Sequence, residues 1–182
     1  MVTEKQIKAL VRQAQQGDTE VFSEIYDLYA PKLYNFLYAR LRHKETAEDL
    51  LSTVFMKAWD NLGSYQPRAS AKFSTWLFQI ANFTLIDHWR TKKDVIDMSK
   101  VENLSIFAQE AKLYENYEFL FSELIKLPSE YQTVLELRFR QDLSVSETAE
   151  IMNKSEVGIR VLQHRALKLL KKNLALRGIT EL

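Results

Sequence analysis

Two pairs of neighbouring side chains could in principle carry acid–base chemistry, Glu48 with Asp49 and Asp87 with His88. Both pairs fall in stretches with helical periodicity, where adjacent side chains point about 100° apart and do not converge on one substrate atom. The sequence places no glycine-rich phosphate loop and no cluster of metal ligands beside them. A helical hydrolase therefore fits these residues poorly, and we expect no catalytic residue, no cofactor and no metal site in this chain.

A basic helix face within residues 156–173 fits a nucleic-acid partner better. Because side chains three and four residues apart share a helix face, this segment has one apolar side and one basic side. The apolar side carries Ile159, Leu162, Ala166, Leu169 and Leu170, and the basic side carries Arg160, Val161, His164, Arg165 and Lys168. The major groove of B-DNA accepts such a helix: arginine bonds guanine edges, lysine and arginine meet phosphates, and valine touches a thymine methyl group.

The residues before this helix have helix-turn-helix spacing. Ser144 and Glu147 form a capping box for a short helix at 145–152, and Ser155 can cap the next helix. Two residues lie between the helices, and Asn153 tolerates the left-handed conformation that a tight turn needs. The alternative is an amphipathic hairpin packed in a bundle. The capping box, the short turn and the basic second helix together favour DNA binding.

Residues 64–93 interleave aromatic with basic side chains. Single-stranded nucleic acid suits such a mixture, because aromatic rings stack on unpaired bases at about 1–3 kcal/mol per base and basic groups follow the phosphates. The alternative is core packing, since Phe73, Leu77, Ile80 and Thr84 recur at helical spacing. Taken alone, this segment favours the core interpretation.

The predicted helix at 45–61 has an inner and an outer face. The inner face carries Leu50, Leu51, Val54, Phe55, Ala58 and the following Leu62, and the outer face carries Asp49, Ser52, Thr53, Met56, Lys57 and Asp60. Trp59 lies near the boundary of the two faces, where it could belong to a partner surface or to the core.

Composition favours helices and argues against several protein classes. The 182 residues include 4 Gly and 3 Pro, far below the usual combined share of about 12%, so a turn-rich sandwich or barrel is hard to build. The absence of cysteine excludes a disulfide scaffold and a Cys-based zinc site. The charged N-terminus and the absence of an apolar run of about 18 residues indicate a soluble, cytoplasmic protein without membrane insertion.

The net charge of +1 conceals a strong asymmetry along the chain. Residues 1–30 carry a net −2, 31–93 a net +5, 94–152 a net −7 and 153–182 a net +5. Two basic blocks separated by an acidic block are typical of a nucleic-acid-binding protein with two contact regions, although helical surfaces also acquire charge runs by chance.

Periodicity predicts an all-α protein of two small helical domains. The helices are expected at 3–16, 19–29, 31–42, 45–61, 71–91, 112–126, 129–140, 145–152 and 156–173. Gly17 and Asp18 mark the end of the first helix and the start of the second, and Thr46 with Asp49 resembles a capping box. Residues 92–111 lack sustained periodicity and are expected to be a flexible linker between an N-terminal bundle, 1–91, and a C-terminal helix-turn-helix domain, 112–182.

In this order, the motifs resemble those of an extracytoplasmic-function (ECF) sigma factor, the small two-domain type of bacterial RNA polymerase specificity subunit. AEDLLSTVFMKAW at 47–59 looks like the helix that docks on the polymerase clamp, and FSTWLFQIA at 73–81 with IDHWR at 86–90 looks like the promoter-melting helix. LPSEYQTVLELRF at 127–139, SETAEIM at 146–152 and RVLQHRA at 160–166 look like the domain that reads the minus-35 element. The resemblance covers nearly the whole chain except the linker.

The resemblance implies three sets of site residues. The first domain would bind core RNA polymerase through Asp49, Ser52, Phe55, Met56, Lys57 and Trp59. It would hold the melted minus-10 strand through Arg68, Ser70, Lys72, Phe73, Trp76, Phe83 and Arg90. The second domain would read the minus-35 duplex through Ser155, Arg160, Val161, His164, Arg165 and Lys168.

The implied partners are clamp and flap-type surfaces of core polymerase, promoter DNA and an anti-sigma factor. Five positions depart from the usual family pattern: Ser52 and Thr53 replace Gln and Glu, Phe83 replaces Asn, and Val157-Gly158 replaces Gly-Thr. The rival interpretation is a stand-alone helix-turn-helix regulator, which would explain residues 129–173 and leave the clamp-like and melting-like motifs unexplained.

Overall fold

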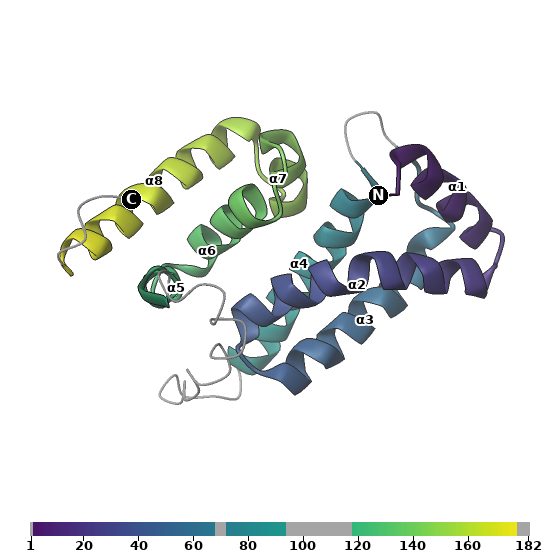
Figure 1. The fold of residues 1–182 in the computed structure, drawn as a ribbon, viewed down its shortest axis with the longest axis horizontal. Coiled ribbons are helices and arrows are strands. Elements are labelled where there is room, and N and C mark those ends of the chain that lie inside the picture. The colour runs from purple at the N-terminus through teal and green to yellow at the C-terminus, as the bar shows by residue number, and fades with distance from the viewer. Residues whose placement is uncertain (1, 68–71, 94–117, 178–182) are drawn as a thin grey trace. The chain divides into compact units, whose positions relative to one another are not determined.

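The structure is a computed structural model of the chain, and it describes residues 2–67, 72–93 and 118–177. The described residues form helices and their connections, without a β-strand (Figure 1). The chain divides into two compact units, Met1–Ile96 with Glu150–Asn153 and Asp97–Ala149 with Lys154–Leu182. The prediction of an all-α protein is therefore confirmed. Most of the expected linker at 92–111 lies outside the described residues.

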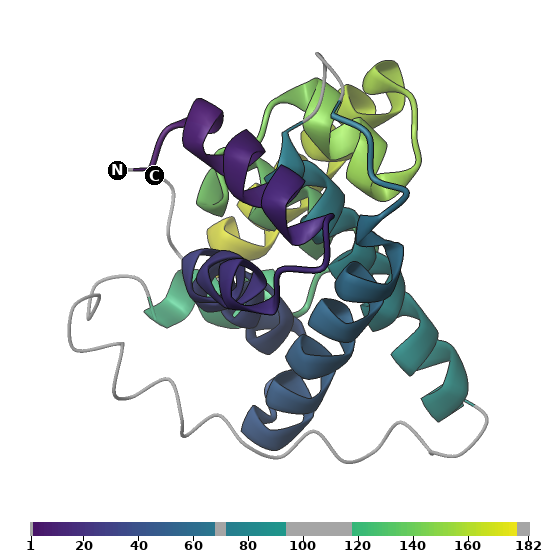
Figure 2. The same ribbon diagram turned by 90° about the vertical axis from the view of Figure 1, so that its right-hand side faces the viewer.

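The first unit is built from α1 (Glu4–Ala14), α2 (Thr19–Leu41), α3 (Lys44–Leu62) and α4 (Phe73–Lys93). Helices α2, α3 and α4 pack against one another, and α1 packs on α2. Figure 2 looks nearly along the axis of α2 and shows α3 and α4 spreading apart toward the lower part of the view. Gly17 adopts a φ of 93° and the Asp18 carboxylate accepts from the N–H of Val21, so the predicted boundary at these residues is confirmed.

Helix α2 continues through Pro31, and the prediction of two helices at 19–29 and 31–42 is wrong. Proline lacks the N–H for one intrahelical hydrogen bond, a defect of about 3 kcal/mol. Buried residues lie on both sides of it, among them Ile25, Leu33 and Leu37, and each contributes about 1.5–3 kcal/mol when buried. Their summed burial exceeds the defect, so the helix does not break.

The start of α3 also differs from the prediction. Its N-cap is His43, whose Nδ1 accepts from the N–H of Thr46 at 3.2 Å, so the expected capping box of Thr46 with Asp49 is wrong. The predicted inner face of this helix is confirmed, because Leu50, Leu51, Val54, Phe55, Ala58 and Leu62 are all buried.

The second unit contains α5 (Glu118–Leu124), α6 (Ser129–Leu135), a π-helical segment η3 (Glu136–Arg140), the first five residues of α7 (Val145–Met152), and α8 (Glu156–Ala175). The single α-helix expected at 129–140 is therefore wrong in its second half. The N–H of Gln141 bonds the carbonyl of Glu136 at 3.0 Å, and Asp142 adopts a φ of 50°. This wider turn brings the buried Leu143 back toward the core before α7 begins.

A buried carboxylate fastens the C-terminal end of the second unit. Glu123 of α5 is only 3% exposed and accepts from Lys126 Nζ at 2.8 Å, and its Oε1 lies 2.7 Å from Nε of Arg177 beyond α8. The hydrogen bond from Lys126 holds the pKa of Glu123 below its ordinary value of 4.5, and Arg177 lowers it further against the effect of burial.

Among the described helices, none combines the length and the hydropathy that crossing a membrane requires.

The Pro31→Ala variant is expected to be more stable than the wild type by about 1–2 kcal/mol, because alanine restores the missing N–H and suits a helix interior. Urea unfolding followed by far-ultraviolet circular dichroism measures the difference. Lys32→Ala, an exposed neighbour in the same helix, serves as the control. A lower midpoint for Pro31→Ala than for wild type would contradict a continuous, unstrained α2.

The stability of the second unit is expected to depend on the Glu123 carboxylate at acidic pH. Folding lowers the pKa of Glu123 below its ordinary value of 4.5. The contribution of this carboxylate to the unfolding free energy is therefore complete above pH 4.5 and is lost as the pH falls through the folded-state pKa. In Glu123→Gln, this part of the pH dependence of the unfolding free energy should disappear. Urea titrations between about pH 6 and pH 3 test it, with Glu24→Gln on the exposed side of α2 as control. Parallel curves for wild type and Glu123→Gln would refute the assignment.

Candidate functional site

The basic face of α8 is exposed as the sequence predicts. Arg160, Val161, His164, Arg165 and Lys168 are all exposed, with Val161 at 44%, and Ile159, Ala166, Leu170 and Leu174 are buried on the other side. Helix α8 packs against α6, which fixes its rotation about its own axis. A row of positive charge, interspersed with the exposed apolar side chains of Val157, Val161 and Leu167, therefore faces outward.

Two caps hold the turn before α8. The Ser144 N–H donates to Glu147 Oε2 at 2.8 Å and the Glu147 N–H donates to Ser144 Oγ at 3.1 Å, which confirms the capping box of α7. Asn153 adopts the left-handed conformation with a φ of 51°. Ser155 Oγ accepts from the N–H of Gly158 at 3.1 Å, so Ser155 caps α8 as expected.

Polar contacts tie α8 to the rest of its unit. Arg138 of η3 donates to Oε1 of Gln163 at 3.1 Å and also to the carbonyl of Leu143. Lys154, in the turn, pairs with Glu130 of α6 at 3.1 Å. On the exposed face, Arg160 pairs with Glu156 one turn before it at 3.2 Å. The outward cations thus stand on a helix that is fixed at its start and along its inner side.

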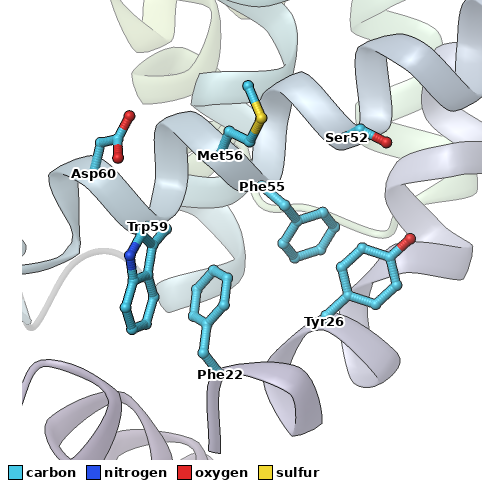
Figure 3. Close-up of a pocket in the computed structure, with 7 residues that line it drawn as sticks. All are labelled: Phe22, Tyr26, Ser52, Phe55, Met56, Trp59 and Asp60. Carbon is cyan, nitrogen blue, oxygen red and sulfur yellow. The ribbon is translucent and has the colours of Figure 1, made fainter. Parts of the chain in front are cut away.

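An open aromatic groove lies between α2 and α3 of the first unit. It has a volume of about 500 Å³ and is lined by Phe22, Tyr26, Ser52, Phe55, Met56, Trp59 and Asp60. Figure 3 shows Phe22 and Tyr26 of α2 pointing toward Phe55 and Trp59 of α3. The ring centres of Phe22 and Trp59 are 4.8 Å apart, and those of Tyr26 and Phe55 are 4.4 Å apart. The groove can accept an apolar side chain against its aromatic lining.

The structure brings four of the six expected polymerase residues to this groove: Ser52, Phe55, Met56 and Trp59. Met56 is 64% exposed at its edge, and Phe55 is buried beneath it. Phe22 and Tyr26 also line the groove and were not predicted from the sequence. Their spacing of one helical turn was the available signal, but it does not reveal which face of α3 they meet.

The remaining two expected polymerase residues lie outside the groove lining. Asp49 is exposed on α3. Lys57 is half-buried, and its Nζ donates to Oγ1 of the buried Thr84 at 3.2 Å. Lys57 therefore links α3 to α4 within the unit as well as bordering the surface.

The residues expected to meet the minus-10 strand occupy different environments. Lys72, Phe83 and Arg90 are exposed, and Arg90 lies 3.9 Å from Asp87. Trp76 is half-buried and Phe73 is buried. The two remaining residues of this set, Arg68 and Ser70, lie outside the described residues.

An aromatic cluster of Tyr29, Tyr65, Phe73 and Trp76 surrounds the start of α4. The Tyr65 ring centre lies 5.1 Å from that of Phe73 and 4.9 Å from that of Trp76, and Tyr29 lies 5.8 Å from Phe73. Burial, with nearby Glu4 and Tyr65, raises the pKa of Tyr29 to about 12, so this phenol stays neutral at physiological pH. Phe73 thus supports the cluster from below, and Trp76 offers part of its surface to solvent.

The two acid–base pairs considered at the outset form surface contacts instead of a converging site. Glu48 pairs with Lys44 at 3.9 Å, and Asp87 pairs with Arg90. In the described part of the chain, no group of three or more His, Asp or Glu side chains is placed to hold a metal ion.

Comparison with known families gives two matches in the expected order. Sigma-70 region 2 matches residues 25–95, and Sigma-70 region 4 matches residues 124–172. The first match contains α3, α4 and the greater part of α2, and the second contains the turn and the basic face of α8.

Individual proteins extend this similarity. The ECF RNA polymerase sigma factor BldN of Streptomyces coelicolor is 34% identical over 173 residues, which cover 88% of this chain and 63% of BldN, so the chain spans less than two thirds of that relative. SigW of Bacillus subtilis, also an ECF RNA polymerase sigma factor, is 31% identical over 185 residues, covering 94% of this chain and 98% of SigW. The sigma factor RpoE of Bartonella quintana, solved with the anti-sigma factor NepR, shares the fold at a TM-score of 0.67 and 20% identity, covering 85% of this chain and 96% of RpoE.

Proposed function

The chain belongs to the ECF sigma factors of the sigma-70 family, and from this premise we propose that it binds core RNA polymerase and directs it to specific promoters. The observation that carries the proposal is the exposed basic face of α8, held by a capped turn inside the region 4 match. We assign polymerase binding and minus-10 recognition to residues 1–91 and minus-35 recognition to residues 112–182.

The groove between α2 and α3 supports the polymerase-binding part of the proposal. A partner can place an apolar side chain against the exposed parts of Phe22 and Trp59 and cover the exposed Met56. Asp49 and Asp60 give the surrounding surface of α3 a negative charge, which suits a partner with basic residues around its apolar anchor. Buried Phe55 shapes the groove floor, and Lys57 borders it while bonded to Thr84.

The start of α4 supports the minus-10 part. A melted DNA strand presents unpaired bases and phosphates, for which the half-exposed Trp76 and the exposed Lys72, Phe83 and Arg90 supply stacking surfaces and cations. Buried Phe73 contributes by holding Trp76 in place. Arg68 and Ser70 enter the proposal on the family resemblance alone.

The minus-35 part rests on α8. Arg160 and Arg165 can bond base edges or phosphates, Lys168 can meet a phosphate, and Val161 can contact a thymine methyl group in the major groove. His164 lies between them, and Ser155 stands at the helix start where phosphates are bound by backbone N–H groups.

The proposal also assigns a setting and a regulator. Nucleotide addition belongs to the polymerase, so we infer that this chain is not an enzyme, contributes no catalytic residue and works in the cytoplasm with the polymerase and DNA. Because RpoE is found with the anti-sigma factor NepR, we infer that an anti-sigma factor also binds this chain.

Run-off transcription tests the function as a whole. Purified core polymerase, with and without the full chain, is given a genomic DNA library, and the start sites that depend on the chain are sequenced. We expect a set of starts that share minus-35 and minus-10 elements. Sequence-specific DNA binding without any polymerase-dependent start would overturn the proposal in favour of a stand-alone regulator.

Met56→Glu is expected to weaken core polymerase binding about tenfold or more, because it buries a new charge at the edge of the apolar groove. Met56 is exposed, so folding should be unaffected. The measurement is fluorescence anisotropy of labelled chain titrated with core polymerase. Leu28→Glu, an equivalent change at an exposed site of α2 outside the groove, is the control. Equal binding by the two variants would remove the groove from the polymerase interface.

Arg160→Ala and Lys168→Ala are expected to have different effects on promoter binding. Loss of a base-reading arginine lowers promoter affinity by about 1–3 kcal/mol and relaxes selectivity at one minus-35 position, whereas loss of a phosphate-binding lysine weakens all sequences alike and reduces the salt slope by about one. Holoenzyme binding to promoters with each minus-35 base substituted, at several salt concentrations, measures both effects. Lys8→Ala on α1 is the control. Unchanged selectivity and unchanged salt slope in both variants would contradict the α8 assignment.

A further inference from the structure

Helix α1 has a specific contact with the end of α3, although it precedes the region 2 match, which begins at residue 25. The half-buried Gln15 stands at the C-terminal end of α1. Its Nε2 donates to the carbonyl of Leu62 at 3.0 Å and to the carbonyl of Tyr65 at 2.8 Å. These two hydrogen bonds join segments that are about 50 residues apart in the sequence.

Gln15 adds hydrogen bonds at the end of α3, where the Leu62 carbonyl also accepts from the N–H of Tyr65 at 3.0 Å. The last carbonyls of an α-helix lack partners within the helix, and a primary amide offers two N–H donors. Here one amide serves both the last residue of α3 and the third residue beyond it. The intervening Gly63 has no atom within 4 Å of where its Cβ would stand, so side-chain packing at that residue does not fix the path of the chain. The amide of Gln15 adds two contacts from α1 to the backbone hydrogen bonds that join Ser64 and Tyr65 to the last turn of α3.

The side chain of Tyr65 contacts the first residues of α4. Its ring packs 4.9 Å from the ring of Trp76 and 5.1 Å from that of Phe73. A backbone that is fixed at the Tyr65 carbonyl therefore fixes a ring that supports the half-exposed face of Trp76. This connection runs from α1 through Gln15 and Tyr65 to the residue proposed to stack on an unpaired base.

The other end of α1 borders the same cluster. Glu4, in its first turn, lies close enough to Tyr29 to affect the ionisation of that phenol. Tyr29 in turn packs against Phe73 at 5.8 Å. Helix α1 is thus in reach of the aromatic cluster through Tyr29 as well as through Tyr65.

We propose that Gln15 is a positioning residue for the minus-10 strand, acting through the two carbonyls that it holds and the tilted ring contact of Tyr65 with Trp76. The inference rests on the proposed function and deepens it, because it gives α1 a part in promoter opening. Gln15 itself need not touch DNA.

The test compares three variants of the full chain in holoenzyme with core polymerase. Gln15→Met removes the amide and keeps the length, Gln13→Met makes the same change at an exposed site of α1, and Val11→Ala loosens the buried side of α1 while leaving the amide. The probe is a fork-junction promoter with a single-stranded minus-10 non-template strand, taken from a start site found by run-off transcription. Core polymerase binding, and binding to a duplex that ends upstream of the minus-10 element, are measured in parallel.

Gln15→Met is expected to weaken fork-junction binding by about three- to tenfold, the loss of one or two hydrogen bonds, and to leave core polymerase and minus-35 duplex binding unchanged. Val11→Ala should be the less stable in urea and yet bind the fork better than Gln15→Met. The inference is overturned if wild type binds the fork and Gln15→Met binds it equally well, or if fork binding follows urea stability alone across the three variants. If the wild-type holoenzyme does not bind the fork-junction probe, the proposed minus-10 role is itself overturned, and the inference with it.

Discussion

Burial of one apolar stripe on each helix is the constraint on which the outer surfaces depend. Helix α8 buries Ile159, Ala166 and Leu170 against its own unit. The rotation of the helix about its axis that this burial requires also turns Arg160 and Lys168 outward. Each buried aliphatic side chain contributes about 1.5–3 kcal/mol, more than an exposed ion pair. The same rule turns Met56 outward on α3, so apolar packing sets the orientation of both proposed binding faces.

Helix ends then decide how these faces are joined. Arg42 and Asn153 adopt a positive φ directly after α2 and α7, and Asp142 does so two residues after the π-helical segment, where a short side chain or local hydrogen bonding offsets the strain. Serine caps at α7 and α8 satisfy backbone N–H groups that packing does not reach. The turn between α7 and α8 is therefore defined locally.

Local rules explain which features could be predicted from the sequence. The inner face of α3, the basic face of α8, the Ser144 capping box and the Ser155 cap follow from spacing alone. Pro31 misled the prediction because tertiary burial on both sides outweighs one missing hydrogen bond. The Phe22 side of the groove and the bonds of Gln15 depend on contacts between residues distant in sequence, which periodicity does not report. The π-helical turn rests on local backbone hydrogen bonds, but apolar spacing does not distinguish it from an α-helix.

Several proposed contact residues already have partners inside the chain, so partner binding is an exchange of interactions. Arg160 pairs with Glu156 and Arg90 with Asp87, both at the surface, where such pairs are worth about 0–1 kcal/mol. A phosphate or a guanine edge can therefore replace either carboxylate with little loss of free energy. Lys57 differs, because withdrawing it would leave the buried Thr84 hydroxyl without that donor. A partner that contacts α3 would therefore retain the Lys57–Thr84 bond and, with it, the connection of α3 to α4.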